Sequence, residues 1–252
     1  MAENEELSFW DHLDILRSII LKVIIVGGAC TLLAFYFKDP IFKIVLAPKD
    51  HGFITYKMLR TESFGISLIN TELTEQFLVH IKVAVFVGIL CASPYIIYQL
   101  YKFISPALYA RERKYSGRIV GSAYVMFFMG NLVNYFLIFP LTLRFLGTYS
   151  VSTEVQNMLT IQSYMDTLLM MALLFGLVFE IPVISWLLAL AGLLKHSWMT
   201  RYRKHAIVGI VILAAVITPT SDIFTLFIVS LPIWLLYELS ILIVKATERQ
   251  NG

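Results

Sequence analysis

The chain has 252 residues, of which 58% are hydrophobic and 15% are charged, and its mean hydropathy is +0.77. So little polar surface excludes a soluble globular protein and indicates a membrane protein with several spans. The formal net charge of +3 is too small to suggest a nucleic acid as the partner.

Residues 1–17 predict an amphipathic segment ahead of the first span. Apolar residues recur in it at helical spacing, with acidic residues between them: Leu7, Trp10, Leu13 and Leu16. Because Trp10 is a typical interfacial anchor, we expect this segment to lie against the lipid headgroups.

The first span is expected near residues 18–37, which is about the 20 apolar residues that a bilayer requires. Lys22 is close enough to its start for the ammonium group to reach the membrane surface. Residues 38–75 then form a long polar segment that we interpret as an ordered cap outside the membrane. The stretch FITYKML at 53–59 predicts a strand or an extended segment within this cap.

The second span, near residues 77–98, leads into a polar island at 99–118. The island holds one carboxylate, Glu112, among five cations: Lys102, Arg111, Arg113, Lys114 and Arg118. By spacing alone, Glu112 could be one acid in a solvated basic loop. The apolar stretch FISPALY before it favours more order, since Pro106 would pin a turn that presents Glu112 at a fixed place.

The third span is expected near residues 119–139 and is predicted to end at Pro140. Small and amide side chains in a span hold helices together, so Gly130, Asn131 and Asn134 predict close packing against a neighbouring helix.

A long apolar run from 163 to 194 carries the fourth span, near residues 165–192. As one straight helix the run would be roughly 48 Å long, more than the roughly 30 Å of hydrocarbon in a bilayer. It must therefore project or bend, and Pro182 is the expected kink.

Two short spans, near residues 206–218 and 223–244, complete the membrane domain. Each has only about 21–23 Å of uninterrupted apolar length at helical rise, so we expect local thinning of the bilayer. Residues 18–245 thus form a single all-α domain with six transmembrane helices, and residues 246–252 form a tail.

The cations predict the orientation of the chain. Six spans place both termini and the basic residues of 99–118 and 195–205 on one side, which the positive-inside rule assigns to the cytoplasm. The cap has five cations of its own, but acids dilute them along a longer loop.

Glu180 is the sharpest chemical feature, because an ionisable residue within an apolar span is costly and marks a function or a buried partner. Asp166 lies fourteen residues earlier, within about 40° of the same helix face and roughly 21 Å away along the axis. We therefore expect one helix face with acid at two depths and a water-accessible groove. The structural alternative is a Glu180 that bonds to a neighbouring helix.

Catalysis, a cofactor and a metal site are not expected. The five histidines are scattered and make no HExxH motif or i,i+4 pair. Neither a GxSxG turn nor a glycine-rich phosphate loop occurs in the sequence.

Together these stretches resemble the TatC subunit of the twin-arginine protein translocase, from about residue 8 to 245. The matching pieces are FWDHLDILR at the start, AP at 47–48, SPYIIYQLYKFISPALYARER at 93–113, NYFLIFPL at 134–141, FGLVFEIPV at 175–183 and ITPTSDIFT at 217–225. FISPALY–RER and the F-E-x-P piece are specific, and their joint order makes coincidence implausible.

The resemblance implies a concave, six-span receptor in the bacterial cytoplasmic membrane that relies on the proton-motive force. It would bind the twin-arginine segment of signal peptides on folded cargo, with single-span subunits of the TatA and TatB type as partners, and it would be oligomeric. The residues predicted for signal-peptide binding are Glu112, Arg17, Phe103 and Pro106, together with Asp11 and Asp14 on the separate hypothesis given below. Those implied for the groove and the partner subunits are Glu180, Gln99, Pro48 and Asp222.

One residue departs from the family pattern. The family usually reads H-L-x-E-L-R, and Ile15 stands at the position of that glutamate in HLDILR. Asp11 lies four residues earlier, within about 40° on a helix, and Asp14 is adjacent. Our hypothesis is that Asp11, helped by Asp14, supplies the missing charge.

Two other classes of membrane protein are alternatives. A small secondary transporter or channel would use Asp166 and Glu180 as a proton or cation path, but such proteins often contain internal repeats, and no convincing repeat occurs here. An intramembrane protease would need a nucleophile–base or paired-aspartate motif, which the sequence lacks.

Overall fold

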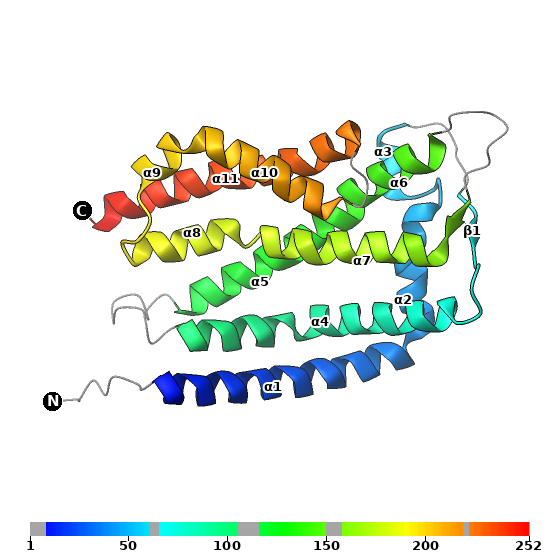
Figure 1. Cartoon of the computed structure of the whole chain (residues 1–252), viewed down its shortest axis with the longest axis horizontal. Coiled ribbons are helices and arrows are strands. Elements are labelled where there is room, and N and C mark those ends of the chain that lie inside the picture. The colour runs from blue at the N-terminus through cyan, green and yellow to red at the C-terminus, as the bar shows by residue number, and fades with distance from the viewer. Residues whose placement is uncertain (1–8, 61–65, 105–115, 150–157, 219–221, 252) are drawn as a thin grey trace.

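The computed structural model describes residues 9–60, 66–104, 116–149, 158–218 and 222–251. Long helices lie side by side in it (Figure 1), and α1 (Phe9–Tyr36) begins at the end of the bundle where α11 (Ile223–Asn251) ends. We call this the terminal end. The opposite end, the cap end, carries the short elements α2 (Lys38–Val45), η1 (Ala47–Lys49) and α3 (Ile54–Met58).

The described residues contain five helical stretches that are long and apolar enough to cross a membrane: Leu13–Tyr36, Glu75–Phe103, Gly117–Thr148, Ile161–Leu190 and Ile223–Arg249. The expectation of an all-α membrane fold is confirmed. The short fifth span corresponds to α10 (Arg203–Ile217), an apolar helix of 15 residues, or about 23 Å. α11 has 29 residues, because this helix continues past Glu238, and only its apolar stretch before Tyr237 is short.

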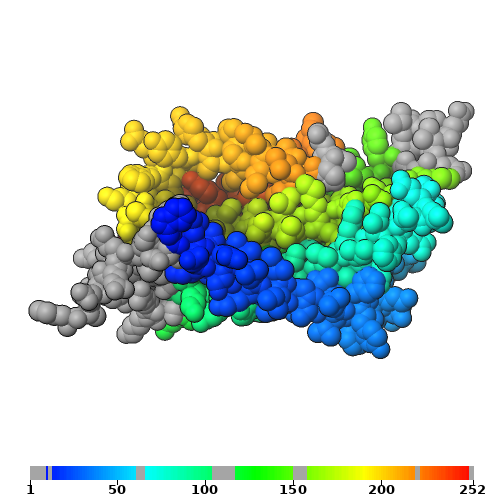
Figure 2. Space-filling model, turned by 60° about the horizontal axis from the view of Figure 1, so that its bottom comes forward, coloured from blue at the N-terminus to red at the C-terminus, as the bar shows by residue number. Residues whose placement is uncertain are grey.

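α1 is one continuous helix of 28 residues. Residues 9–17 of the amphipathic segment expected ahead of the first span are therefore the first turns of α1 itself and not a separate helix along the headgroups, while residues 1–8 lie outside the described residues. No glycine or proline occurs in α1 before Gly27 to end the helix earlier. α1 packs along α4 (Glu75–Ile104) and lies on the outside of the bundle (Figure 2).

The third span does not end at Pro140, and that prediction is wrong. α5 (Ser116–Val133) continues through a π-helical turn, η4 (Asn134–Ile138), into α6 (Phe139–Thr148). Pro140 is in the first turn of α6, and its missing N–H leaves the carbonyl of Phe136 without a helical donor. The Thr55 hydroxyl of the cap donates to this carbonyl instead, so the helix persists beyond the proline.

The fourth span is broken where Pro182 predicts. α7 (Ile161–Val178) ends and α8 (Ile181–Leu190) begins on either side of Phe179 and Glu180. Because Pro182 cannot donate to the carbonyl of Val178, the helical bonding pattern stops there and starts again with Glu180 directly ahead of α8.

The core of the bundle forms where α4, η4, α6, α7, α10 and α11 meet, and its fully buried members include Met171, Phe175, Ile217 and Ile233. Gly130 allows α5 to approach α7, since a Cβ there would lie 2.6 Å from the Phe175 carbonyl oxygen. Asn134 Nδ2 donates to the carbonyl of Leu168 at 3.5 Å. The close packing predicted for Gly130 and Asn134 is confirmed. It is confirmed for Asn131 too, because a Cβ at Gly176 of α7 would lie 2.8 Å from Asn131 Nδ2, which donates its hydrogen bond within its own helix to Phe127.

FITYKML does not form a strand, because a helical turn brings its two polar side chains to the same neighbour. Thr55 and Tyr56 are adjacent and both buried, and a strand would point them to opposite faces. The Tyr56 hydroxyl donates to the carbonyls of Pro48 at 2.9 Å and Pro140 at 3.1 Å. Burial raises the pKa of the Tyr56 phenol well above its usual value.

The Glu75 carboxylate joins two loops at the cap end. It is 1% exposed and accepts hydrogen bonds from the backbone N–H groups of Thr71 and Gln162, both at 2.8 Å. Beside it, β1 (Leu68–Ile69) and β2 (Leu159–Thr160) form a parallel pair. The segments that precede α4 and α7 are therefore held together by one acid and a short ladder.

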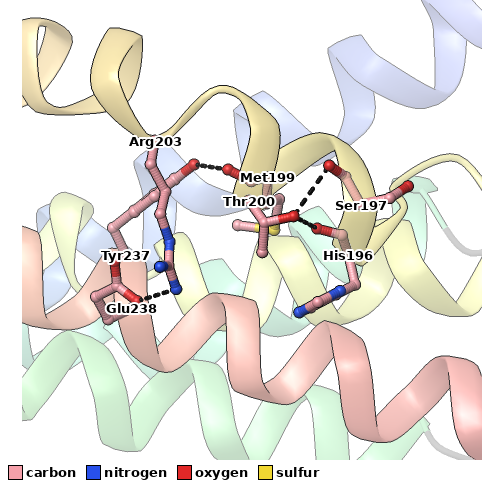
Figure 3. Close-up of polar contacts among 7 residues, drawn as sticks. All are labelled: His196, Ser197, Met199, Thr200, Arg203, Tyr237 and Glu238. Atoms are coloured by element: carbon pink, nitrogen blue, oxygen red, sulfur yellow. Dashed lines mark hydrogen bonds and ion pairs between the residues drawn. The ribbon is translucent and has the colours of Figure 1, made fainter.

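The short helix α9 (His196–Arg201), which connects α8 to α10, is attached to α11 at the terminal end (Figure 3). The Tyr237 hydroxyl donates to the carbonyl of Met199 at 2.8 Å, and the Arg203 guanidinium pairs with Glu238 at 2.8 Å. This pairing explains how a carboxylate is accommodated within the long apolar stretch of α11 that precedes Lys245.

Substitution of Tyr56 by Phe is expected to lower the free energy of unfolding by about 1–3 kcal/mol, because it removes the donor to two buried carbonyls. Thermal unfolding in detergent micelles measures the change. Tyr36→Phe is the matched control, since Tyr36 is 80% exposed. An equal loss in both variants would contradict the role given to Tyr56.

Substitution of Glu75 by Gln replaces one acceptor oxygen by a donor and removes the charge. We expect faster hydrogen exchange of the backbone N–H groups of Thr71 and Gln162, measured by mass spectrometry of peptides. Glu72→Gln is the control, because the Glu72 side chain is exposed. Unchanged exchange in the Glu75 variant would show that the β1–β2 pair alone joins the two loops.

Candidate functional site

Two cavities lie on opposite sides of α4, in the half of the bundle nearer the terminal end. The inner cavity, of about 520 Å³, lies between α4, α5, α7 and α8. The α1–α4 groove, of about 480 Å³, lies between α1 and α4. Helical periodicity separates them, because Gln99, Lys102 and Phe103 face α1 while Ile97, Leu100 and Tyr101 face the inner cavity.

Glu180 is the one carboxylate on the lining of the inner cavity, where Ser93 and Tyr101 are the other polar residues. The Oε1 atom of Glu180 and the Tyr101 hydroxyl are buried, and neither has a hydrogen-bond partner among the described residues. Unpaired polar atoms in an apolar space are costly. The cavity is therefore suited to a helix or peptide that brings a hydrogen-bond donor into an apolar environment.

Asp166 does not share this cavity, so the prediction of one groove with acid at two depths is wrong. Its carboxylate pairs with Lys82 of α4 at 2.6 Å, and both side chains are almost half exposed. The inner-cavity lining takes Leu173, Leu177 and Glu180 from this span and does not include Asp166. Asp166 thus has a charged partner, whereas the Oε1 atom of Glu180 has no hydrogen-bond partner among the described residues.

The α1–α4 groove gathers residues from both helices: Asp14, Ile15, Ser18, Ile19, Lys22, Gln99, Lys102 and Phe103. Three of the predicted site residues thus lie together, namely Asp14, Gln99 and Phe103. Gln99 is 7% exposed, and its Nε2 donates to the Tyr95 hydroxyl at 2.6 Å. With two lysines and one aspartate, the lining has a formal charge of +1.

The other predicted site residues lie elsewhere or outside the described residues. Arg17 is exposed on α1 and does not line the groove. Asp11 is in the first turns of α1, and its side chain is outside the described part, as are Glu112 and Pro106.

Pro48 and Asp222 do not lie with Glu180 or Gln99. Pro48 is buried in the cap, where its carbonyl accepts from Tyr56. Asp222 precedes α11, and its Oδ1 accepts from the Thr225 N–H at 2.7 Å. The four residues expected around one groove therefore occupy separate places.

Sequence reasoning missed three polar residues of the groove, Ser18, Lys22 and Lys102. Each was interpreted alone, as part of a span or of a basic island. The signal was available in the hairpin of the first two spans, because antiparallel packing brings the start of the first span beside the end of the second.

Among the described residues no group of three His, Cys, Asp or Glu side chains is arranged to hold a metal ion.

Known proteins resemble this chain over nearly its whole length. The family model described as TatC, the Sec-independent protein translocase protein, matches residues 11–232. TatC of Koribacter versatilis is 34% identical over 235 residues, which cover 93% of this chain and 84% of that protein. TatCy of Bacillus subtilis is 30% identical over 245 residues, which cover 97% of this chain and 91% of that protein.

The fold agrees with a solved structure. The crystal structure of the twin-arginine translocase receptor TatC, a six-helix membrane protein, matches with a TM-score of 0.77 at 31% identity. The match covers 94% of this chain and 99% of that one. This chain is thus a component of a protein translocase, and it belongs to the TatC family of Sec-independent protein translocase proteins.

Proposed function

We propose that this chain is the twin-arginine signal-peptide receptor and core scaffold of a translocase that exports folded proteins with the proton-motive force. The observation that carries the proposal is the α1–α4 groove, where Asp14, Gln99 and Phe103 meet. The segment with Glu112 leaves α4 at Ile104 and joins α5 at Ser116, and both ends lie at the terminal end near this groove. Asp14 and Glu112 would then share the two guanidinium groups.

We place the terminal end in the cytoplasm of a bacterium, with both termini on that side of the inner membrane. The supporting observation is the concentration of cations on the elements that end there: Arg17, Lys102, Arg118, Lys195, Arg201, Arg203, Lys204, Lys245 and Arg249. Cations flank the cytoplasmic ends of spans by the positive-inside rule.

The inner cavity is the proposed place for the apolar part of the signal peptide and then for a single-span partner subunit of the TatA or TatB type. Its lining is apolar, and Glu180 and Tyr101 offer polar atoms that lack a partner within the described residues. A transmembrane helix with a hydroxyl or amide side chain would satisfy them, since polar side chains hydrogen-bond across helices in membranes.

The transporter alternative receives little support from the geometry. The predicted path uses Asp166 and Glu180 together, but Asp166 is paired with Lys82 outside the cavity that Glu180 lines. Glu180 alone does not make a relay across the membrane.

The receptor proposal predicts that Glu112→Gln weakens binding of a peptide with an Arg-Arg pair about tenfold to a hundredfold. A charge-assisted hydrogen bond to a guanidinium contributes about 1.5–3 kcal/mol. Fluorescence anisotropy of labelled peptide with the chain in nanodiscs measures the affinity, and a Lys-Lys peptide tests selectivity. Asp39→Asn, at an exposed residue of α2, is the control.

The double variant Asp11→Asn and Asp14→Asn tests the replacement for the missing glutamate in the same assay. A loss of binding is expected, because one carboxylate would remain for two guanidinium groups. Unchanged affinity would show that these acids do not replace it. Two results together would favour the transporter alternative. The Glu112→Gln variant would export cargo as well as the unchanged chain, and the chain would conduct an ion flux that Asp166→Asn abolishes.

For the inner cavity, Glu180→Gln and Glu180→Leu separate partner binding from stability. Both are expected to reduce crosslinking of a single-span subunit to a photoreactive residue at Ile184, which lines the cavity. Glu180→Leu should leave the chain at least as stable as before, because it removes an unpaired buried acid. Asp166→Asn is the control, and equal crosslinking in all variants would refute the role of Glu180.

A further inference from the structure

Two lysines on facing helices point to a second kind of ligand in the α1–α4 groove. Lys22 of α1 and Lys102 of α4 both line it, and neither forms an ion pair with a described residue. Both belong to helical stretches that are apolar enough to cross a membrane. Cations at such positions are expensive unless an anion or water compensates them.

The helical register brings these groups to one level of the membrane. α1 and α4 approach each other closely at Gly88, where a Cβ would lie 2.3 Å from the Thr31 hydroxyl. Counted toward the terminal end from this crossing, Ser18 lies about 20 Å away and Lys102 about 21 Å away at helical rise. Lys22 lies about 14 Å away, and its flexible side chain extends toward the same level.

The resulting donor set suits a phosphate group. Two ammonium groups and the Ser18 hydroxyl surround an open volume, and lysine binds phosphate as a compact point charge. Asp14 is the one carboxylate on the lining, and it lies about one helical turn farther out than Ser18. An anion at the level of Ser18 therefore meets more positive than negative charge.

The surroundings favour a phosphate that belongs to a lipid. α1 is an outer helix of the bundle (Figure 2), and its side chains next to the groove are exposed and apolar, with Ile20 48% and Leu21 51% exposed. The groove itself is lined by Ile15, Ile19 and Phe103. An acyl chain can lie along these surfaces while its headgroup reaches the lysines.

We propose that the α1–α4 groove binds the phosphate group of one anionic phospholipid from the leaflet at the terminal end. Lys22, Lys102 and Ser18 hold the phosphate, and the apolar residues beside them contact the glycerol and acyl chains. Basic pockets between transmembrane helices bind anionic headgroups by the same chemistry.

The test of this lipid site does not depend on the proposed receptor function, because lipid binding is measured without any peptide. One consequence rests on the proposed function. The phosphodiester of the lipid changes the formal charge of the groove from +1 to zero, which makes it a better place for two guanidinium groups.

Native mass spectrometry of the full chain, delipidated in detergent micelles, tests the proposal with phosphatidylglycerol as the probe. We expect one bound lipid per chain, and binding about 30-fold weaker in the double variant Lys22→Gln and Lys102→Gln. Lys22→Arg with Lys102→Arg keeps both charges and should retain the lipid. Lys195→Gln with Lys204→Gln is the matched control, since these exposed cations lie at the same end outside the groove.

Three further arms decide the source and the location of the phosphate. Phosphatidylcholine and millimolar inorganic phosphate should fail to displace phosphatidylglycerol, and Ile15→Glu should weaken its binding because it adds an anion to the lining. Displacement by inorganic phosphate would show a site for free phosphate and overturn the lipid proposal. Equal binding of phosphatidylcholine, an equal loss in the control pair, or full binding by Ile15→Glu would overturn it as well.

Discussion

Hydrocarbon offers no hydrogen-bond partner to a backbone, so each proline inside a span of this chain creates a carbonyl that the protein must satisfy by other means. At Pro140 the cap does so, because Thr55 and Tyr56 donate to the carbonyls of Phe136 and of Pro140 itself. The same contacts attach the cap to the bundle. The buried Tyr56 hydroxyl thus bonds both to the helix that continues at Pro140 and to Pro48 of the cap, and so holds the cap against this helix.

At Pro182 the chain responds in the opposite way and breaks the helix. The break lies beside Glu180, and it puts this acid on the lining of a cavity that is nearly all apolar. An unsatisfied acid is destabilising where it stands, and this cost is the reason that a partner for Glu180 is proposed above. The paired acids of the same chain show the contrast, since Glu75, Asp166 and Glu238 each have a partner within the described residues.

α4 organises the functional half of the molecule by dividing its two cavities. One face of α4 presents Gln99, Lys102 and Phe103 to α1, and the face behind presents Leu100 and Tyr101 to the inner cavity. A peptide that docks its charged part on one side and its apolar part on the other would have to pass around the end of α4. That end leads directly into the segment that carries Glu112.

Local patterns succeeded where one interaction decides the outcome and failed where two compete. Pro182 lies in an apolar run too long for a bilayer, and the span breaks there as expected. Pro140 carries the same local signal, yet the helix continues because a distant hydroxyl replaces the missing donor. FITYKML has strand-forming residues, but two adjacent polar side chains with one neighbour require a helical turn. Asp166 and Glu180 share a face only on an unbroken helix. In the structure Asp166 pairs with Lys82 outside the inner cavity that Glu180 lines.

The sequence by itself determined the membrane class, the family and the presence of a costly acid at residue 180, because hydropathy, proline and motif order are local properties. Only the tertiary structure decided that Asp14, Gln99 and Phe103 share a groove with Lys22 and Lys102. It also decided that α4 separates this groove from Glu180. The physical reason is that helix packing fixes which faces meet, and the residues on those faces are more than seventy positions apart in the chain.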